Sequence, residues 1–294
     1  MIESEHFFNN ARETVNHHIL TLISDDMPPA LYEAMRYSLE NGGKRIRPLL
    51  TLATGYVFGK DIAEIILPAC AVEMIHTYSL IHDDLPAMDN SDYRRGKPSC
   101  HVKFGEALAI LTGDALLTIA FDVVRDYGVK HDNEKKALQI CHLLSLAAGP
   151  QGMVGGQVLD LEAEGISLRQ ADIEKIAALK TGKIISASVI IGAIAGGASE
   201  EEIAVLEQFA NKIGLAFQIV DDLFDYEDSN IDIGKPVGID QAAVKATIPG
   251  LIGTAQARKY VEMLFQDALS FLDELDRPVQ LLSDLASKMV YRKK

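Results

Sequence analysis

Apolar residues recur at spacings of three and four along almost the whole chain, which is the pattern of helices that bury one face. No strand-like stretch of comparable length interrupts this pattern, and neither a linker nor a low-complexity tract divides it. We therefore expect an all-α fold in a single domain, residues 1–294, with roughly ten helices bundled around a central cavity. The expected helices cover residues 3–24, 30–40, 62–85, 105–127, 134–147, 168–197, 200–226, 254–275 and 278–291, and an apolar run fills residues 49–58.

The composition narrows the possible functions. A net charge of −14 argues against nucleic-acid binding, which requires a basic surface, and leaves no polybasic membrane anchor. The apolar run 184–198 is shorter than the roughly 20 residues that span a bilayer, and the first residues lack the features of a signal peptide. The three cysteines, Cys70, Cys100 and Cys141, fit no zinc or disulfide pattern. We expect a soluble, cytoplasmic protein without stable membrane association.

The segment 69–96 carries the first candidate site. Its apolar pattern predicts a helix that ends before Pro86, because proline lacks a backbone donor and keeps the preceding residue out of the α region. The loop that follows can fold Asp89 back towards Asp83 and Asp84, and three converging carboxylates repel one another unless a cation neutralises them. Oxygen ligands of this kind suit Mg²⁺. The alternative is a solvated acidic loop after a helix.

Cations accompany these acids. Arg94 and Arg95 follow the acidic loop, and guanidinium groups bind phosphate oxygens in pairs and stay charged. A glycine pair turns the chain at residues 42–43, and three cations come directly after it: Lys44, Arg45 and Arg47. In so acidic a chain this basic turn indicates a second phosphate contact, although solvated cations at a helix boundary would look the same.

A second acidic cluster lies in the sequence GLAFQIVDDLFDYED. Spacings of three and four place four residues on one helical stripe: Gln218, Asp221, Asp222 and Asp225. Like charges at these spacings call for a counter-ion, unless the stripe is an exposed acidic face. Lys235 and Lys245 follow it. Two carboxylate clusters, each followed by cations, predict two walls of one site that holds a diphosphate through several metal ions.

Glycines and the chain end give three further expectations. The glycine-rich start of the segment 149–165 lets backbones approach closely. Gly182 weakens the helix around it, so we expect a kink near Thr181. The basic C-terminal residues 292–294 could cover bound diphosphates or fray into solvent, and we expect fraying.

The motifs DDLPAMD with RRG, DDLFD, GGKRIRP, KTGK, GMVGGQ and GKPVGIDQ together resemble the short-chain trans-prenyltransferases of the polyprenyl synthetase family. The resemblance spans residues 40–250 and is strongest to the family's bacterial farnesyl diphosphate synthases. The four residues between the second and third aspartates of the first cluster are shared with these enzymes and with plant geranylgeranyl diphosphate synthases. It implies the isoprenoid synthase fold and a homodimer.

The resemblance also implies roles for individual residues. In this family an allylic diphosphate binds through three Mg²⁺ ions between two acidic walls, and isopentenyl diphosphate occupies a metal-free basic pocket. The residues that match metal ligands are Asp83, Asp84, Asp89, Asp221, Asp222 and Asp225. Those that match the isopentenyl diphosphate pocket are Lys44, Arg47, His76 and Arg95. Those that match allylic contacts are Arg94, Lys180, Lys235 and Lys245, with Thr181 and Gln218 beside the developing carbocation.

The implied reaction is Mg²⁺-dependent head-to-tail condensation of isopentenyl diphosphate with dimethylallyl or geranyl diphosphate, with release of diphosphate. Ser79 lies one turn before Asp83, and Tyr78 lies five residues before it, where the growing chain meets its floor in the family. Because a helical turn advances about 5.4 Å, close to one isoprene unit, a bulky Tyr78 predicts farnesyl diphosphate as the product. Geranylgeranyl diphosphate is the alternative product, and Tyr78 as a plain core residue is the alternative role.

Three other classes of protein share part of this pattern. A non-catalytic prenyltransferase-like regulatory subunit usually lacks acids from one cluster, and this chain retains both. A terpene cyclase has no need of a basic second-substrate pocket, so Lys44, Arg47 and Arg95 disfavour it. The interpretation as a purely structural helical protein does not explain the two stacked acidic clusters.

Overall fold

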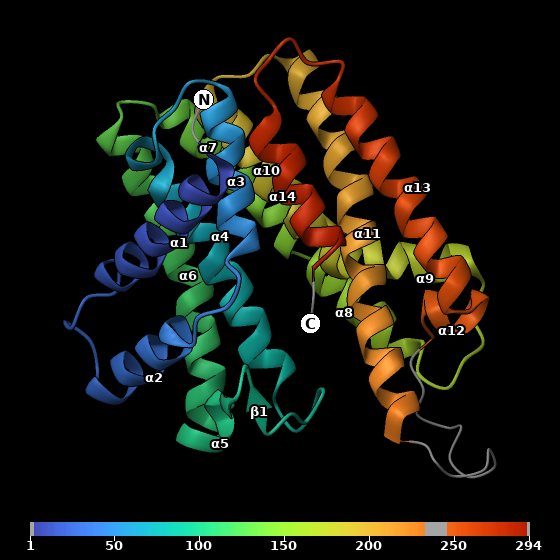
Figure 1. Cartoon of the computed structure of the whole chain (residues 1–294). Coiled ribbons are helices and arrows are strands. Elements are labelled where there is room, and N and C mark those ends of the chain that lie inside the picture. Colours follow the sequence, from blue (N-terminus) through green and yellow to red (C-terminus); the bar gives the residue numbers. More distant parts are fainter. Residues whose placement is uncertain (1–2, 233–245, 293–294) are drawn as a thin grey trace. The chain divides into compact units, whose positions relative to one another are not determined.

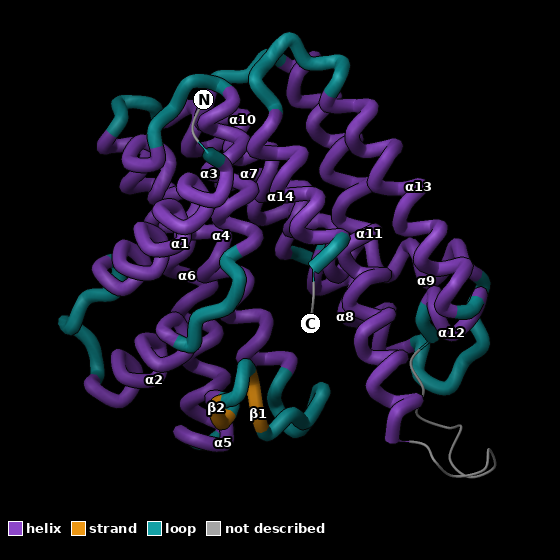
Figure 2. Tube along the Cα trace, in the orientation of Figure 1, coloured by secondary structure: helices purple, strands orange, loops and turns teal. Residues whose placement is uncertain are grey.

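The computed structural model describes residues 3–232 and 246–292, and in these ranges the regular secondary structure is almost entirely helical (Figure 2). The all-α prediction is confirmed. The helices are α1 (Ser4–Thr21), α2 (Pro29–Glu40), α3 (Ile46–Val57), α4 (Ile62–Asp83), α5 (Cys100–Phe104), α6 (Glu106–Lys130), α7 (Glu134–Ala148), α8 (Met153–Glu162), α9 (Gln170–Ala177), the π-helical η1 (Ala178–Gly182), α10 (Lys183–Gly196), α11 (Glu200–Asp232), α12 (Ile248–Ile252), α13 (Thr254–Leu272) and α14 (Gln280–Val290). Two short strands, β1 (Tyr93–Arg94) and β2 (Lys97–Pro98), form a hairpin.

The long helices lie where the apolar pattern predicts them, within a few residues, except that α11 runs to Asp232, beyond its predicted end at residue 226. The pattern does not predict α5 or α12, because a five-residue helix is too short to show a period. It also misses the hairpin, in which Arg94 pairs with Lys97. The turn between them places Arg95 and Gly96 at φ of 53° and 77°, as two-residue hairpin turns require.

Contacts along the chain divide it into two compact units. Unit 1 comprises residues 1–142 and 191–197, and unit 2 comprises residues 143–190 and 198–294. The single domain over residues 1–294 stays a prediction. The first acidic cluster and the basic turn belong to unit 1, and the second acidic cluster belongs to unit 2.

Helix α4 is the central element of unit 1. It packs against α3 and α6, with which it lies side by side in Figure 1. A capping box starts it, because the side chain of Asp61 accepts from the third backbone N–H while Glu64 accepts from the backbone N–H of Asp61. Nearly every side chain from Ile65 to Ile75 is buried. A charged residue within that run, Glu73, therefore needs a partner inside the protein.

Helix α11 has the corresponding place in unit 2, where it packs along α13 and against η1 (Figure 1). The segment Ala178–Gly182 is π-helical, and the predicted kink near Thr181 stays a prediction. The expected close approach at the glycine-rich segment is confirmed, since a Cβ atom on Gly156 would lie 2.3 Å from the backbone nitrogen of Lys180. Gly214 of α11 meets Gly182 in a similar way.

Among the described residues, four helical segments are long and apolar enough, by length and composition alone, to cross a membrane: Ile62–Asp83, Glu106–Lys130, Gln170–Gly196 and Glu200–Tyr226. In the most apolar 18-residue windows of Ile62–Asp83 and Gln170–Gly196, 78% and 67% of the residues are buried inside the protein. The apolar side chains of these two segments therefore belong to the core. In Glu106–Lys130 the corresponding window is 39% buried. That helix exposes apolar side chains, among them Leu111 and Val129.

Candidate functional site

The basic turn of unit 1 is held in an unusual backbone conformation. Gly42, Gly43 and Arg45 have φ of 64°, 112° and 50°, all in the left-handed region. The Arg95 guanidinium fills the space that a side chain would need at Gly43, where a Cβ atom would lie 2.4 Å from its Cζ. Arg95 also donates a hydrogen bond to the carbonyl of Gly42. The hairpin and the turn are thereby joined, and Lys44 of the turn is exposed.

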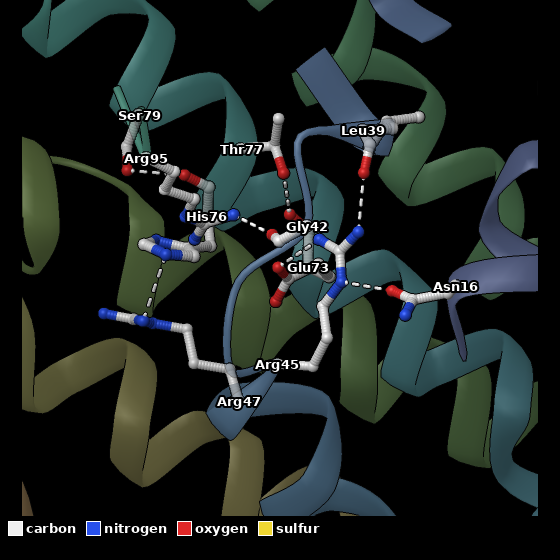
Figure 3. A network of polar contacts seen from close by, with 10 residues as sticks. All are labelled: Asn16, Leu39, Gly42, Arg45, Arg47, Glu73, His76, Thr77, Ser79 and Arg95. Atoms are coloured by element: carbon white, nitrogen blue, oxygen red, sulfur yellow. Dashed lines mark hydrogen bonds and ion pairs between the residues drawn. The ribbon is translucent and has the colours of Figure 1, made fainter. Parts of the chain in front are cut away.

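Arg47 and His76 meet at the start of α3 and in the middle of α4. Arg47 Nη1 lies 3.2 Å from His76 Nε2 (Figure 3). A guanidinium can only donate, so Nε2 accepts and the ring carries its proton on Nδ1. Loss of hydration lowers the pKa of His76 well below its usual value, and the nearby cations Arg47, Arg95, Arg45 and Arg94 lower it further. The imidazole is therefore neutral.

A buried ion pair lies directly beside these groups. Arg45 Nη1 donates to Glu73 Oε1 over 2.7 Å, and both side chains are 1% exposed. Arg45 also donates to Asn16 Oδ1 over 2.8 Å and to the carbonyl of Leu39. Figure 3 shows the guanidinium reaching these three partners from the same turn that carries Arg47. The residues Lys44, Arg47, His76 and Arg95 are called the basic cluster below.

The first acidic cluster follows the sequence prediction in its backbone and departs from it at one side chain. The loop after α4 does turn back, since the Asp89 N–H donates to the carbonyl of Asp83 over 2.9 Å. Asp84, however, is 2% exposed and forms an ion pair with Arg94. That pair raises the pKa of Arg94, and the charges of Asp83 and Asp89 add to the rise. Asp84 thus pairs with an arginine in this structure.

The second cluster forms a chain of hydrogen bonds on unit 2. The Thr181 hydroxyl donates to the side-chain oxygen of Gln218, whose amide donates to Asp222 Oδ1 over 2.7 Å. Lys180, next to Thr181 in η1, bonds Asp160 Oδ2 over 2.7 Å. The predicted stripe therefore contacts the KTGK segment directly.

Negative charge is crowded around Asp222. Burial raises the pKa of Asp222 to about 6, against a hydrogen bond from Gln218 that lowers it. The neighbouring carboxylates of Asp221, Asp225 and Asp160 raise the pKa further. A cation bound among these acids would relieve this repulsion.

Arg292, near the C-terminus, supplies one such cation. It forms an ion pair with Asp221, its side chain is 9% exposed, and its Cζ lies 4.1 Å from the centre of the Phe217 ring. The expectation that this end frays is wrong for Arg292, because ion pairing and stacking bury it. Residues 293–294 lie outside the described part of the chain.

Within residues 3–232 and 246–292, no group of three or more histidine, cysteine, aspartate or glutamate side chains is arranged so that it could hold a metal ion. The oxygen-rich donor set and the raised pKa of Asp222 nevertheless fit a hard divalent cation. Lys235 and Lys245, the predicted allylic diphosphate contacts after the second cluster, lie outside the described residues.

The two predicted chain-length residues lie on α4 between the basic and acidic clusters. Tyr78 is 6% exposed, with its ring 5.8 Å from that of His82. Burial raises the pKa of Tyr78 to about 12, and the charge of Asp83 adds to the rise. The Ser79 hydroxyl donates to the carbonyl of His76 over 2.9 Å.

Comparison with known proteins decides the family. The polyprenyl synthetase family model matches residues 28–277. The chain belongs to the polyprenyl synthetase family. It is 47% identical over 273 residues to the farnesyl diphosphate synthase of Geobacillus stearothermophilus, covering 92% of each chain. It is 43% identical to geranylgeranyl pyrophosphate synthase 4 of Arabidopsis thaliana, covering 90% of this chain and 71% of that one. Among solved structures, an FPP/GFPP synthase from Zymomonas mobilis matches with a TM-score of 0.87 and 35% identity over 98% of both chains.

The sequence analysis named no role for Glu73 and did not identify the partners of Arg45 and Arg292. Glu73 gave a signal, because a carboxylate within an apolar helical run requires a buried partner. Arg45 gave none that separated it from Lys44 and Arg47. Arg292 also gave none, because its partner Asp221 lies 71 residues away in the sequence.

Proposed function

We propose that the protein condenses isopentenyl diphosphate with dimethylallyl and geranyl diphosphate to give farnesyl diphosphate, with Mg²⁺ as the cofactor. The observation that carries the proposal is the composition of α4. This helix bears His76, bonded to Arg47 of the basic turn, and ends at Asp83, towards which the loop folds Asp89 back. A basic diphosphate pocket and acidic metal ligands on one element support a two-substrate prenyltransferase.

The basic cluster would bind isopentenyl diphosphate without metal. Lys44, Arg47 and Arg95 would supply positive charge to the diphosphate oxygens. The Nδ1–H of the neutral His76 ring is a hydrogen-bond donor, because Arg47 already engages Nε2. The pocket therefore offers donors and positive charge and no competing acceptor on the imidazole.

The acids would bind the allylic diphosphate through metal. Five carboxylates fit Mg²⁺ by their oxygen chemistry: Asp83, Asp89, Asp221, Asp222 and Asp225. Three ions are the number that the family resemblance implies, and when bound they would stabilise negative charge on the departing diphosphate. Asp84, predicted from the sequence as a sixth ligand, would instead hold Arg94, the predicted allylic phosphate contact, in place.

The chain's own residues would then guide the allylic cation. Thr181 and Gln218 fix each other's orientation by their hydrogen bond, so their oxygens would present partial negative charge at one place. Lys180, with Lys235 and Lys245, would contact the allylic diphosphate. The double bond of isopentenyl diphosphate attacks the cation, a carbon–carbon bond forms, and the released diphosphate accepts the proton. No protein nucleophile is needed.

The buried position of Tyr78 supports farnesyl diphosphate as the product. A large side chain on α4, five residues before Asp83, would close the tunnel for the growing chain, with Ser79 beside it. Geranylgeranyl diphosphate synthesis is the second candidate, favoured by the similarity to a plant enzyme of that name. A non-catalytic regulatory subunit is the third.

We further propose a soluble, cytoplasmic homodimer. The apolar side chains of Ile110, Leu111 and Val129 on α6 are 45%, 57% and 69% exposed. A second copy that covered them would bury this apolar surface.

One assay tests the activity. The protein is incubated with Mg²⁺, isopentenyl diphosphate and either dimethylallyl or geranyl diphosphate, and product length is measured by mass spectrometry. We expect farnesyl diphosphate from both primers and no product when the metal is chelated. Absence of condensation with every allylic primer would overturn the proposal in favour of the regulatory subunit.

A further inference from the structure

The buried pair of Arg45 and Glu73 lies beside the basic cluster but outside the substrate contacts assigned so far. The Arg45 guanidinium is held by three different helices or their ends, through Asn16 of α1, Leu39 of α2 and Glu73 of α4. Hydrogen bonds to three elements restrict where this buried guanidinium can lie. It therefore acts as an anchor for the backbone that carries it.

That backbone is strained. Arg45 has φ of 50° and ψ of 36°, a left-handed conformation that is unfavourable for a residue with a side chain and costs on the order of 1 kcal/mol or more. It also starts α3, because its carbonyl accepts from the N–H of Leu49 over 3.0 Å. Lys44 precedes this residue and Arg47 follows it in the first turn of α3. The anchoring of Arg45 thus sets the direction in which both neighbouring cations leave the backbone.

Glu73 links this anchor to the rest of the basic cluster. It lies three residues before His76 and therefore on the same face of α4. Its charge raises the pKa of Arg95, against the larger effect of lost hydration that lowers it. Its second oxygen, Oε2, is buried and has no hydrogen-bond partner among the described residues. One carboxylate thus balances the charges of Arg45 and Arg95 while half of its hydrogen-bonding capacity stays unused.

We propose that Glu73 and Arg45 are positioning residues for the isopentenyl diphosphate pocket. The pair holds the strained turn so that Lys44 and Arg47 face the diphosphate, and it places this turn against the face of α4 that carries His76. Neither residue touches the substrate. The inference rests on the proposed function, because it assigns the pocket to isopentenyl diphosphate.

A double variant separates positioning from stability. In Arg45→Met/Glu73→Met the two charges are replaced together by apolar side chains of similar length, a change that is often neutral for folding. The matched control is Arg36→Met/Glu40→Met, which removes the exposed ion pair of α2, with side chains 45% and 42% exposed and a 2.8 Å contact. Each protein is assayed for KM of both substrates and for kcat. Binding of isopentenyl diphosphate alone is measured by calorimetry.

We expect the melting temperature of the double variant to lie within a few degrees of that of the wild type. Its KM and Kd for isopentenyl diphosphate should be at least tenfold higher. The KM for geranyl diphosphate should stay within twofold and kcat within threefold, and the control should match the wild type throughout. A folded double variant whose isopentenyl diphosphate affinity stays within twofold of the wild type overturns the proposal.

Two further arms keep the test decisive. If the double variant does not fold, Asn16→Ala removes only the acceptor of Arg45 Nε. It should raise the KM for isopentenyl diphosphate about threefold, and an unchanged value overturns the proposal. If the wild type makes no product, the proposed function fails, and the calorimetric comparison then decides the positioning role by itself.

Discussion

Arg47 and His76 form a hydrogen bond over 3.2 Å in which the guanidinium donates and the imidazole accepts. The bond fixes the ring as a neutral species with its proton on Nδ1. Burial and four nearby arginines favour that state, because each of them penalises a second positive charge. The relationship makes His76 a source of pH dependence.

The first prediction concerns stability at acidic pH. The pKa of His76 is lowered in the folded protein, so below the ordinary value of 6.5 the unfolded chain binds a proton that the folded chain does not. Stability contributed by the neutral ring is therefore present above that value and is lost as pH falls below it, by on the order of 1 kcal/mol per pH unit. We expect His76→Gln to lose less stability than the wild type between pH 7.5 and 5.5 in chemical denaturation. Parallel pH profiles for the two proteins would contradict the prediction.

The second prediction concerns the acids. Asp83→Ala and Asp221→Ala should each lower kcat by roughly two orders of magnitude or more while circular dichroism stays unchanged, because each removes a proposed metal ligand. Asp122→Ala, at an exposed aspartate of α6, serves as the control and should retain activity. Wild-type rates in either of the first two variants would remove that residue as a ligand.

The third prediction separates Asp84 from Asp83. Because Asp84 is buried against Arg94, Asp84→Asn should lower the melting temperature and raise the KM for the allylic substrate. The Mg²⁺ concentration at half-maximal rate should change more in Asp83→Asn than in Asp84→Asn. The reverse order would restore Asp84 as a metal ligand.

The fourth prediction concerns product length. Tyr78→Ala should shift the product from farnesyl towards geranylgeranyl diphosphate and longer chains, since it opens space along α4. Tyr78→Phe keeps the ring and should leave the product unchanged. The alanine variant is also expected to lose about 3–5 kcal/mol of stability, as large-to-small core changes do, so products are analysed well below its melting temperature. An unchanged farnesyl product would remove Tyr78 as the floor.

The fifth prediction concerns Arg292. Its ion pair with Asp221 places a protein cation where the proposed metal would bind, so the two should compete. Arg292→Met keeps an apolar stem against Phe217 and removes the charge. We expect Arg292→Met to bind inorganic diphosphate at a severalfold lower Mg²⁺ concentration than the wild type does, as measured by calorimetry. An unchanged or higher requirement would argue against competition.

Much of the fold could be predicted because its helices are long and amphipathic. A helix such as α4 repeats its apolar period over several turns, so its type and bounds are readable from local spacing. The one-turn helix α5 and the hairpin β1–β2 are too short to show an apolar period. Their contacts are tertiary, since α5 packs against α2 and α6, and the hairpin accepts hydrogen bonds from Tyr37 and Asn41.

By itself, the sequence determined the all-α class, the family and the approximate place of the acidic and basic clusters, since all of these are encoded in local spacing and residue type. Only the tertiary structure decided which charges meet. Arg45 pairs with Glu73, which lies 28 residues away in the sequence, Arg94 pairs with Asp84, and Arg292 pairs with Asp221. Such pairings depend on the packing of whole helices, and a buried charge takes the partner that packing places within reach.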